Sequence, residues 1–274
     1  MPVSETDALQ HPFGLFTAAV PAQNLAAAVT EQLELQADIR LLTVLLPAGA
    51  LEPLAGQFYM LRAWRADEAP LLSRPISVHD YDEKTRRLRF LYQIKGEGTR
   101  RLAALTAGDS LRLTGPAGNG FPLEKLHGAV ALVGGGIGTA PLLQLAQTLA
   151  ARGCAVDFFA GYRDAPYALT AFEDVCRTVS VATDSGAYGR RGFVTDLFDP
   201  AAYTAVCACG PEVMMQKTAR MCAEKGVPCY VSKEAKMACG VGACLGCTCH
   251  TKQGARSVCK NGPVFEGRDV YDCG

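Results

Sequence analysis

Short apolar runs separated by turn residues fill the first part of the chain. Residues 39–46, 88–94 and 111–113 have the apolar character of β-strands. Glycine and proline interrupt these runs at close intervals, at Pro47, Gly49, Pro53, Gly56, Pro75, Gly96, Gly98, Gly108, Gly115 and Pro116. The pattern predicts a small antiparallel β-barrel over residues 36–121. An N-terminal tail or extension is predicted over residues 1–35, of which 1–12 form a loose tail.

The pattern changes at about residue 122, where strand-like and helix-like stretches begin to alternate. Strand-like runs lie at 129–133, 155–160, 178–182 and 203–208, and helix-like runs at 140–151 and 212–225. This alternation is typical of a doubly wound α/β domain, predicted here over residues 122–231. From 232 to 274 the chain is rich in glycine and cysteine, so a metal centre would have to organise this small third domain.

Composition and charge restrict the function classes. Hydrophobic residues make up 49% of the 274 positions, enough for a sizeable core, and the formal net charge is zero. Nucleic-acid binding would call for a clustered basic face, so we expect no such partner. The apolar runs are shorter than the roughly 20 residues of a membrane-spanning helix. Residues 1–10 contain Glu5 and Asp7 and no basic residue, unlike a secretory signal, so we expect a cytoplasmic protein.

The twelve cysteines are unevenly distributed, with none before residue 154 and five between 239 and 259. In a chain without an export signal, metal or redox roles are favoured over disulfides. The C-x4-C-x2-C…C spacing of plant-type [2Fe–2S] sites is formed by Cys239, Cys244, Cys247 and Cys259. Thiolates are soft donors that suit iron, and the loop can turn sharply at Gly240, Gly242 and Gly246.

Two alternatives apply to this cysteine segment. Structural zinc usually takes two C-x2-C pairs or one pair with histidines, whereas the segment has one pair and an oddly placed His250. Cys249 would replace Cys247 as a ligand only by giving up the x2 spacing, so we interpret it as a spare or packing cysteine. Core positions are predicted for Cys154, Cys176, Cys207, Cys222 and Cys229. The terminal Cys273 has no interpretation.

A glycine-rich loop at residues 134–141 follows a predicted strand and opens a predicted helix. This is the context in which a dinucleotide pyrophosphate binds at a helix N-terminus, and a tight turn without a ligand is the alternative. Thr139 stands where the last glycine of G-x-G-x-x-G belongs. The candidate contacts are Gly134, Gly135, Gly136, Gly138 and Thr139. Arg163 and Asp164 both follow the second strand, which leaves NAD and NADP open.

Two weaker motifs lie in the predicted barrel. Arg74-Pro75-Ile76-Ser77 is either a ligand contact or a strand-edge turn with a solvated arginine. Gly96-Glu97-Gly98-Thr99 is either a phosphate cradle of backbone N–H groups and the Thr99 hydroxyl or a hairpin turn. A nicotinamide donates two electrons as hydride and a [2Fe–2S] cluster accepts one. A flavin between them would divide the pair.

The order of these motifs resembles that of the ferredoxin–NADP reductase superfamily. The shared segments are 74–77, Tyr92-Gln93-Ile94, 96–99, Gly115-Pro116-Ala117-Gly118-Asn119-Gly120-Phe121, 134–141, Cys209-Gly210-Pro211 and 239–259. The cysteine segment, continued to Gly262-Pro263-Val264-Phe265, resembles the electron-transfer subunits of class 1B dihydroorotate dehydrogenase. The resemblance covers about residues 36–270.

The resemblance implies FAD against the barrel, with Arg74 on its pyrophosphate and Ser77 near its isoalloxazine ring. The rest of the implied FAD site is Pro75, Ile76, Leu91, Tyr92, Gln93, Gly98 and Thr99. Ile76 stands where many plant-type reductases have a tyrosine. The nicotinamide would approach the flavin near Cys209, Gly210 and Pro211.

The implied partner is an FMN-containing catalytic subunit that oxidises dihydroorotate in pyrimidine biosynthesis, in a heterotetramer of two of each subunit. Electrons would pass from FMN through the cluster and FAD to NAD⁺, and the chain would have no catalytic residue for dihydroorotate. An alternative is a reductase of the same architecture serving a sulfide dehydrogenase or hydrogenase partner. A zinc-stabilised binding protein with a degenerate nucleotide fold is another. The four cysteines argue against the related subunit of NADH-dependent ferredoxin:NADP oxidoreductase, in which an aspartate takes one cluster position.

Overall fold

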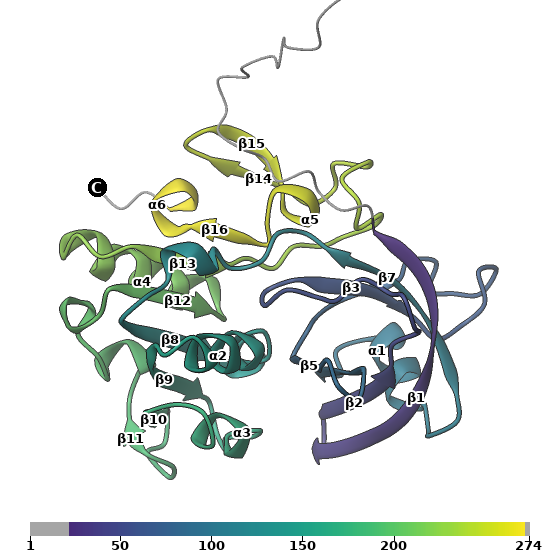
Figure 1. Ribbon diagram of the computed structural model, residues 1–274, viewed down its shortest axis with the longest axis horizontal. Helices are drawn as coiled ribbons and strands as arrows, with labels where there is room; N and C mark the ends of the chain where they lie inside the picture. The colour runs from purple at the N-terminus through teal and green to yellow at the C-terminus, as the bar shows by residue number, and fades with distance from the viewer. Residues whose placement is uncertain (1–21, 272–274) are drawn as a thin grey trace, which may run out of the picture.

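Two seven-stranded sheets organise residues 22–271, the part of the chain that the computed structural model describes (Figure 1). The first sheet is antiparallel, in the order β4-β3-β7-β1-β2-β6-β5, and it curls around its own core. Its strands are β1 (Gln23–Gln36), β2 (Ile39–Leu45), β3 (Phe58–Arg62), β4 (Arg74–Ser77), β5 (Asp80–Asp82), β6 (Arg87–Gln93) and β7 (Ser110–Ala117). One helix, α1 (Glu97–Ala103), lies between β6 and β7 in sequence.

The N-terminal tail or extension predicted over residues 1–35 includes a strand of the first sheet. Residues 23–35 form most of β1, which pairs with β2 on one side and β7 on the other. The prediction was wrong here because a run of alanines at 26–28 carries little strand propensity, although Ala27 and Val29 are buried. The loose tail predicted for residues 1–12 lies outside the described residues, as does Cys273.

The second sheet has the order β11-β10-β9-β8-β12-β13-β16. Its first six strands are parallel, namely β8 (Ala129–Gly135), β9 (Ala155–Tyr162), β10 (Thr178–Thr183), β11 (Arg190–Arg191), β12 (Ala205–Cys209) and β13 (Cys229–Ser232). Helices α2 (Leu142–Ala151) and α3 (Thr170–Glu173) pack on one face and α4 (Glu212–Glu224) on the other. Both faces are therefore covered, as in a doubly wound fold.

The core of this sheet explains most of the cysteines outside the terminal segment. Successive residues of β8 point to opposite faces, so Val130 and Leu132 pack with α2 while Ala131 and Val133 pack with α4. The predicted core positions Cys207, Cys222 and Cys229 are buried. Cys154 and Cys176 are partly buried against the α2 side.

The C-terminal segment joins the second sheet through a strand of its own. It contains β14 (Thr248–Thr251), β15 (Gly254–Ser257), α5 (Val258–Asn261), β16 (Val264–Glu266) and α6 (Gly267–Val270). Strand β16 pairs antiparallel with β13, with Tyr230 opposite Glu266 and Ser232 opposite Val264. The segment predicted to begin at residue 232 therefore shares a sheet with the α/β domain, and Figure 1 shows it in yellow across the top of that domain. Outside this segment, the described residues also form the short 3-10 helices η1 (Leu123–Lys125), η2 (Gly136–Thr139), η3 (Val194–Asp196) and η4 (Pro200–Ala202).

His79 connects the two sheets. It follows β4, and its Nδ1 lies 2.8 Å from the carbonyl oxygen of Ala140. Gln144 of α2 donates its backbone N–H to the His79 carbonyl and its side-chain amide to Pro53, at 3.0 and 2.8 Å. Burial lowers the pKa of His79, so the ring stays neutral.

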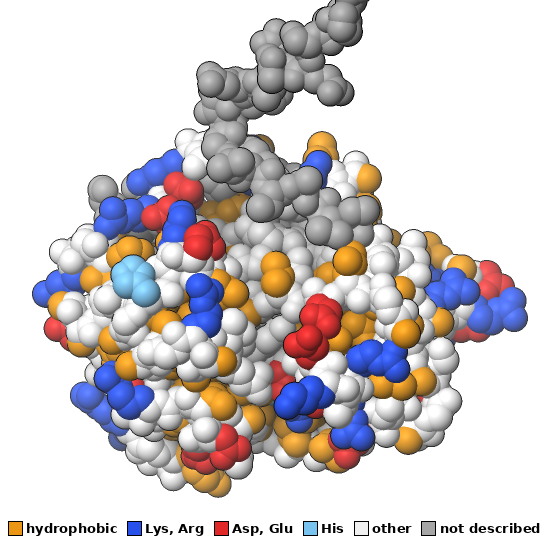
Figure 2. Space-filling view, in the orientation of Figure 1, with side chains coloured by type: hydrophobic (Ala, Val, Ile, Leu, Met, Phe, Trp, Pro, Cys, Tyr) orange, Lys and Arg blue, Asp and Glu red, His pale blue; other side chains and the backbone are white. Residues whose placement is uncertain are grey.

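The surface of the molecule carries both signs of charge. Figure 2 shows basic and acidic side chains interspersed on one face. Among residues 22–271, no helix has the length and apolar character needed to cross a membrane.

Candidate functional site

A cavity of about 230 Å³ lies where the curled sheet, the α/β domain and the C-terminal segment meet. Eight residues predicted to bind FAD line it, namely Arg74, Pro75, Ile76, Ser77, Leu91, Tyr92, Gln93 and Thr99. They come from β4, β6 and α1, which the sheet order brings to one place. The remaining walls include Ile137 and Cys209 from the α/β domain, and Lys233, Glu234 and Met237 from the segment after β13. We call this space the flavin cavity.

Arg74 is held against the first turn of α1. Its Nη1 donates to the carbonyl oxygens of Leu72 and Ser73 at 2.7 and 3.3 Å. A Cβ on Gly98 would overlap the Arg74 Nε and lie 2.9 Å from its Cζ, so the glycine allows this close approach of the guanidinium. The ninth predicted FAD residue thus acts by admitting the guanidinium. An uncommitted guanidinium edge beside a cavity suits an anionic group such as a pyrophosphate.

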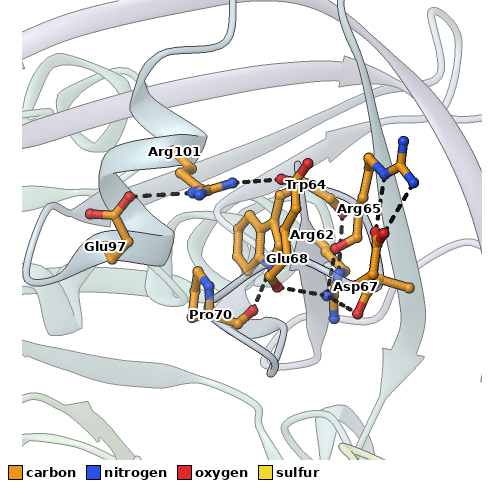
Figure 3. A network of polar contacts seen from close by, with 9 residues as sticks. Arg62, Trp64, Arg65, Asp67, Glu68, Pro70, Glu97 and Arg101 are labelled. Carbon is orange, nitrogen blue, oxygen red and sulfur yellow. Dashed lines mark hydrogen bonds and ion pairs between the residues drawn. The ribbon is translucent and has the colours of Figure 1, made fainter.

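The loop before Arg74 is fixed by a network that the sequence did not single out (Figure 3). The Arg62 guanidinium donates at 2.6–3.2 Å to the carbonyl oxygens of Trp64, Arg65, Ala66 and Leu71. Arg101 of α1 joins Glu68 of the loop at 2.8 Å and Glu97 at 3.3 Å. The loop is therefore tied both to itself and to α1. No short motif marks Arg62, because its partners are carbonyl groups that any residue supplies.

The segment 96–99 begins a helix, so the hairpin turn considered for it is wrong. Thr99 Oγ1 accepts from the N–H groups of Lys95 and Gly96 at 2.9 and 3.1 Å and donates to the Gly96 carbonyl at 2.9 Å. This hydroxyl therefore caps α1.

Tyr92, which lines the flavin cavity from β6, accepts a hydrogen bond from Gln32 at 2.9 Å, and burial raises the pKa of Tyr92 to about 12. The Tyr92 phenol is therefore neutral.

A second cavity, of about 550 Å³, lies beyond the carboxyl ends of the parallel strands. Its size falls in the range of roughly 300–1,000 Å³ that is usual for small-molecule sites. Two predicted glycines, Gly135 and Gly136, line it with Pro211. This is the crevice in which open α/β sheets bind nucleotides. We call it the nucleotide cavity.

The other predicted glycines close the loop and do not line this cavity. A Cβ on Gly138 would lie 2.5 Å from the Cys209 carbonyl oxygen, and a Cβ on Gly134 would lie 2.6 Å from Thr139 Cγ2. Thr139 is buried and donates to the Gly136 carbonyl at 3.0 Å. These three residues therefore let the loop pack tightly. The loop itself is the 3-10 helix η2, and α2 begins only at Leu142.

The sequence Cys209-Gly210-Pro211 joins the two cavities. Cys209 lines the flavin cavity and Pro211 lines the nucleotide cavity. Gly210 between them has room for no side chain, since a Cβ there would lie 2.9 Å from the backbone of Gly135. Burial raises the pKa of Cys209 to about 12, so its thiol is uncharged. The two cavities therefore adjoin at this turn.

Sequence reasoning missed several residues of the nucleotide cavity. Phe193 is 69% exposed and Val213 is 76% exposed, although both are large and apolar. Lys217 lies with its Nζ 5.8 Å from the centroid of the Phe193 ring and 2.9 Å from Asp196. Arg163, which the sequence did single out for the choice between NAD and NADP, also lines this cavity and pairs with Asp164 at 2.9 Å. The sequence carried no signal for Phe193 and Val213, because residues of these types are usually buried and their exposure is seen only in the fold.

Backbone N–H groups point at the sulfur atoms of all four predicted cluster ligands. Gly242 N lies 3.1 Å from Cys259 Sγ, and Val241 N lies 3.5 Å from Cys239 Sγ. The sulfur atoms of Cys244 and Cys247 accept from Gly246 and Cys259, at 3.5 and 3.4 Å. Such donors stabilise charged thiolates, which are the form that binds iron. The donor set of this loop therefore fits an iron–sulfur cluster.

The thiol groups differ in their readiness to ionise. Partial burial raises the pKa of Cys239, but the N–H groups of Val241 and Cys244 outweigh it and bring the pKa to about 6. Burial, with a contribution from Cys247, raises the pKa of Cys259 to about 12. In the described residues no three His, Cys, Asp or Glu side chains are grouped closely enough to hold a single metal ion. The assignment of the four ligands stays a prediction.

Asn119 holds the cysteine segment to the curled sheet. Its side-chain amide donates to the carbonyl oxygens of Asn261 and Val264 at 3.0 and 2.9 Å, and its Oδ1 accepts from Val264 N at 3.1 Å. Its backbone N–H donates to Gly262 at 2.7 Å. The motif at 115–121 thus has a structural role that its sequence did not reveal.

Comparisons with known proteins agree with this geometry. Residues 234–271 match the family described as the iron-sulfur cluster binding domain of dihydroorotate dehydrogenase B. The chain is similar to a solved structure of NADH-dependent reduced ferredoxin-NADP oxidoreductase, with a TM-score of 0.79 and 28% identity over 89% of both chains. It is also similar to the ferredoxin reductase in carbazole 1,9a-dioxygenase, with a TM-score of 0.63 and 25% identity over 77% of this chain and 68% of that one. The predicted fold class is confirmed.

Relatives of known name match most of the chain. The dihydroorotate dehydrogenase B (NAD(+)) electron transfer subunit of Clostridium acetobutylicum is 48% identical over 81% of this chain and 88% of its own length. The protein of the same name from Clostridium perfringens is 44% identical over 79% of this chain and 86% of its own. The chain therefore belongs to the family of dihydroorotate dehydrogenase B electron transfer subunits.

Proposed function

We propose that this chain carries electrons between NAD and an FMN-containing dihydroorotate dehydrogenase catalytic subunit, through FAD and a [2Fe–2S] cluster, in pyrimidine biosynthesis. The observation that carries the proposal is the turn Cys209-Gly210-Pro211, which joins the nucleotide cavity to the flavin cavity. The flavin cavity also receives Met237, two residues before Cys239. This arrangement supports a path in which the three predicted centres adjoin in the order that electron transfer requires.

Each group of residues has a role in this proposal. FAD, when bound, supplies the exchange between hydride and single electrons. Its phosphates would be held by Arg74 beside Gly98, and its ring would be bounded by Pro75, Ile76, Ser77, Leu91, Tyr92, Gln93 and Thr99. NAD would lie along Gly135 and Gly136, with Gly134, Gly138 and Thr139 shaping the loop. The neutral Cys209 and the rigid Gly210-Pro211 turn would exclude water where the two ligands meet.

The partner completes the proposal. The cluster would be held by Cys239, Cys244, Cys247 and Cys259, and Cys244 is exposed, so a partner can approach it. We propose a cytoplasmic heterotetramer of two of each subunit, with no nucleic-acid partner. The direction of electron flow follows from the potentials of the two substrates.

An anaerobic titration of the isolated, cofactor-loaded chain with NADH tests the internal part of this path. We expect flavin absorbance to bleach and a cluster signal to appear in electron paramagnetic resonance. The Cys239→Ser variant is the control, since it should lose the cluster signal and keep flavin bleaching. A wild-type chain whose cluster stays oxidised while its flavin is fully reduced would refute the path.

A further inference from the structure

Strand β3 touches both the flavin cavity and the cysteine loop with one face. Phe58 lines the flavin cavity, and Met60, two residues on, points to the same side of the strand. Both belong to the apolar cluster that contains Cys247 and Cys259. Side chains of this strand therefore lie between the two predicted redox centres.

Met60 is in direct contact with the cysteine loop. Gly240, the residue after Cys239, has a φ of +72°, and a Cβ there would overlap Met60 Cγ and lie 2.9 Å from its Sδ. The loop backbone therefore rests on the methionine side chain, which is only 3% exposed. In the sheet, Met60 pairs with Pro75 of the flavin segment. One residue thus links the start of the cluster loop to the strand that bounds the flavin.

The rest of the cysteine segment is anchored elsewhere. Asn119 holds residues 261–264 by the hydrogen bonds described above. Those bonds fix the end of the segment that follows Cys259, whereas they do not reach Cys239. The contact with Met60 supports the other end of the loop, next to Cys239.

We propose that Met60 is a positioning residue that holds the Cys239 end of the cluster loop at a fixed, densely packed separation from the flavin cavity. The inference rests on the proposed function. It names a residue on which the rate of electron transfer between the flavin and the cluster depends. Electron tunnelling slows exponentially with distance and slows further across a void. Truncating Met60 would leave a cavity beneath the loop or let the loop shift, because cores relax only partly around a lost side chain.

The test compares Met60→Ala with Met215→Ala. Met215 lies on α4 in the same apolar cluster and is equally buried, so it controls for the loss of a methionine from this core. Rapid mixing of the loaded chain with NADH should give unchanged flavin reduction in both variants. Electron transfer from flavin to cluster should slow severalfold in Met60→Ala alone.

A distance measurement separates positioning from general loosening. Pulsed electron paramagnetic resonance on partly reduced protein should give a longer or broader flavin-to-cluster distance in Met60→Ala than in wild type or Met215→Ala. Met60→Leu should restore the wild-type values, and Met60→Val should lie between. If Met60→Ala fails to load the cluster, the valine variant carries the same test.

The outcomes also separate this inference from the proposed function. Equal rates and distances in the Met60 and Met215 variants would overturn the role of Met60 while leaving the electron path intact. A wild-type cluster that NADH cannot reduce would overturn the proposed function itself.

Discussion

Arg74 depends on its neighbours for its position, which makes it the sharpest residue to test in the flavin cavity. The Leu72 carbonyl orients its guanidinium, and Gly98 gives it room. Charge-assisted hydrogen bonds contribute about 1.5–3 kcal/mol. Arg74→Ala should therefore weaken FAD binding by about one to two orders of magnitude. Fluorescence titration of the apoprotein with FAD measures this.

The matched control for Arg74 is Arg65→Ala. Arg65 lies in the same loop, is exposed and pairs with Asp67 at 3.0 Å, a contact that contributes little to stability. Its loss should leave FAD affinity unchanged. Full flavin retention by Arg74→Ala after extensive dialysis would contradict the assignment of Arg74 to the pyrophosphate.

The cysteines allow a second prediction at this scale. Serine in place of Cys239, Cys244, Cys247 or Cys259 should abolish the cluster signal in electron paramagnetic resonance, because a hydroxyl is a harder and less acidic ligand. Cys249→Ser should keep the signal, since Cys249 is half-buried in β14 and packs against the core. Loss of the signal in Cys249→Ser with retention in Cys247→Ser would show that the ligand set is wrong.

Single residues were predictable where local spacing carries the chemistry. The order of Arg74, Ser77 and the four cysteines along the chain was enough to place them in candidate sites. Arg62 was missed because its partners are carbonyl groups that any residue supplies, and Asn119 was missed because its partners lie 142–145 residues away along the chain. Such long-range partners leave no trace in a short motif.

At the scale of elements, strands with strong apolar patterns were predictable and β1 was not. Strands β2, β6 and β8 carry leucine, valine and phenylalanine at their buried positions. Strand β1 buries only the small side chains of Ala27 and Val29 among its apolar positions, so its apolar pattern is weak. Its strand conformation depends instead on hydrogen bonding to β2 and β7. The glycine loop was predicted in the right place, although it forms a 3-10 helix before α2.

Asp157 joins the N-terminal ends of β9 and β10 through hydrogen bonds, so its loss should destabilise the fold. Arg177 donates to this buried carboxylate, as do Thr178 at 2.8 Å and Tyr203 at 2.9 Å. The hydrogen bond from Arg177 is the main reason that the pKa of Asp157 is lowered, although burial opposes it. Asp157→Asn should lower the free energy of unfolding by about 1–3 kcal/mol at pH 7.

The pH dependence of this loss has a definite sign. A carboxyl with a folded-state pKa below its unfolded value of about 3.9 stabilises the fold above that pH and loses the effect as pH falls through the folded-state pKa. The difference between wild type and Asp157→Asn in urea unfolding should therefore shrink as pH is lowered below about 4. Asp164→Asn, which removes an exposed ion pair, is the control and should cost at most about 1 kcal/mol at any pH. An Asp157→Asn effect no larger than this control would contradict the account.

At the scale of the whole molecule, the cysteine segment unites the two domains. Strand β16 extends the α/β sheet, Asn119 ties the segment to the curled sheet, and Met237 and Pro263 line the flavin cavity. The sequence predicted three consecutive parts in the correct order. It could not predict that the third part closes the cavity between the other two, because those contacts join residues far apart in the chain.

The most direct test of the central claim is dihydroorotate-dependent reduction of NAD⁺, measured with and without a catalytic subunit. The loaded chain alone should oxidise NADH with artificial acceptors and neither consume dihydroorotate nor form orotate. Addition of the FMN-containing subunit from the same cell should create NAD⁺ reduction that is lost in Cys239→Ser, while the flavin of that variant still reacts with NADH. Dihydroorotate oxidation by the chain alone would contradict the account, and failure to couple with that subunit would favour a reductase serving another partner.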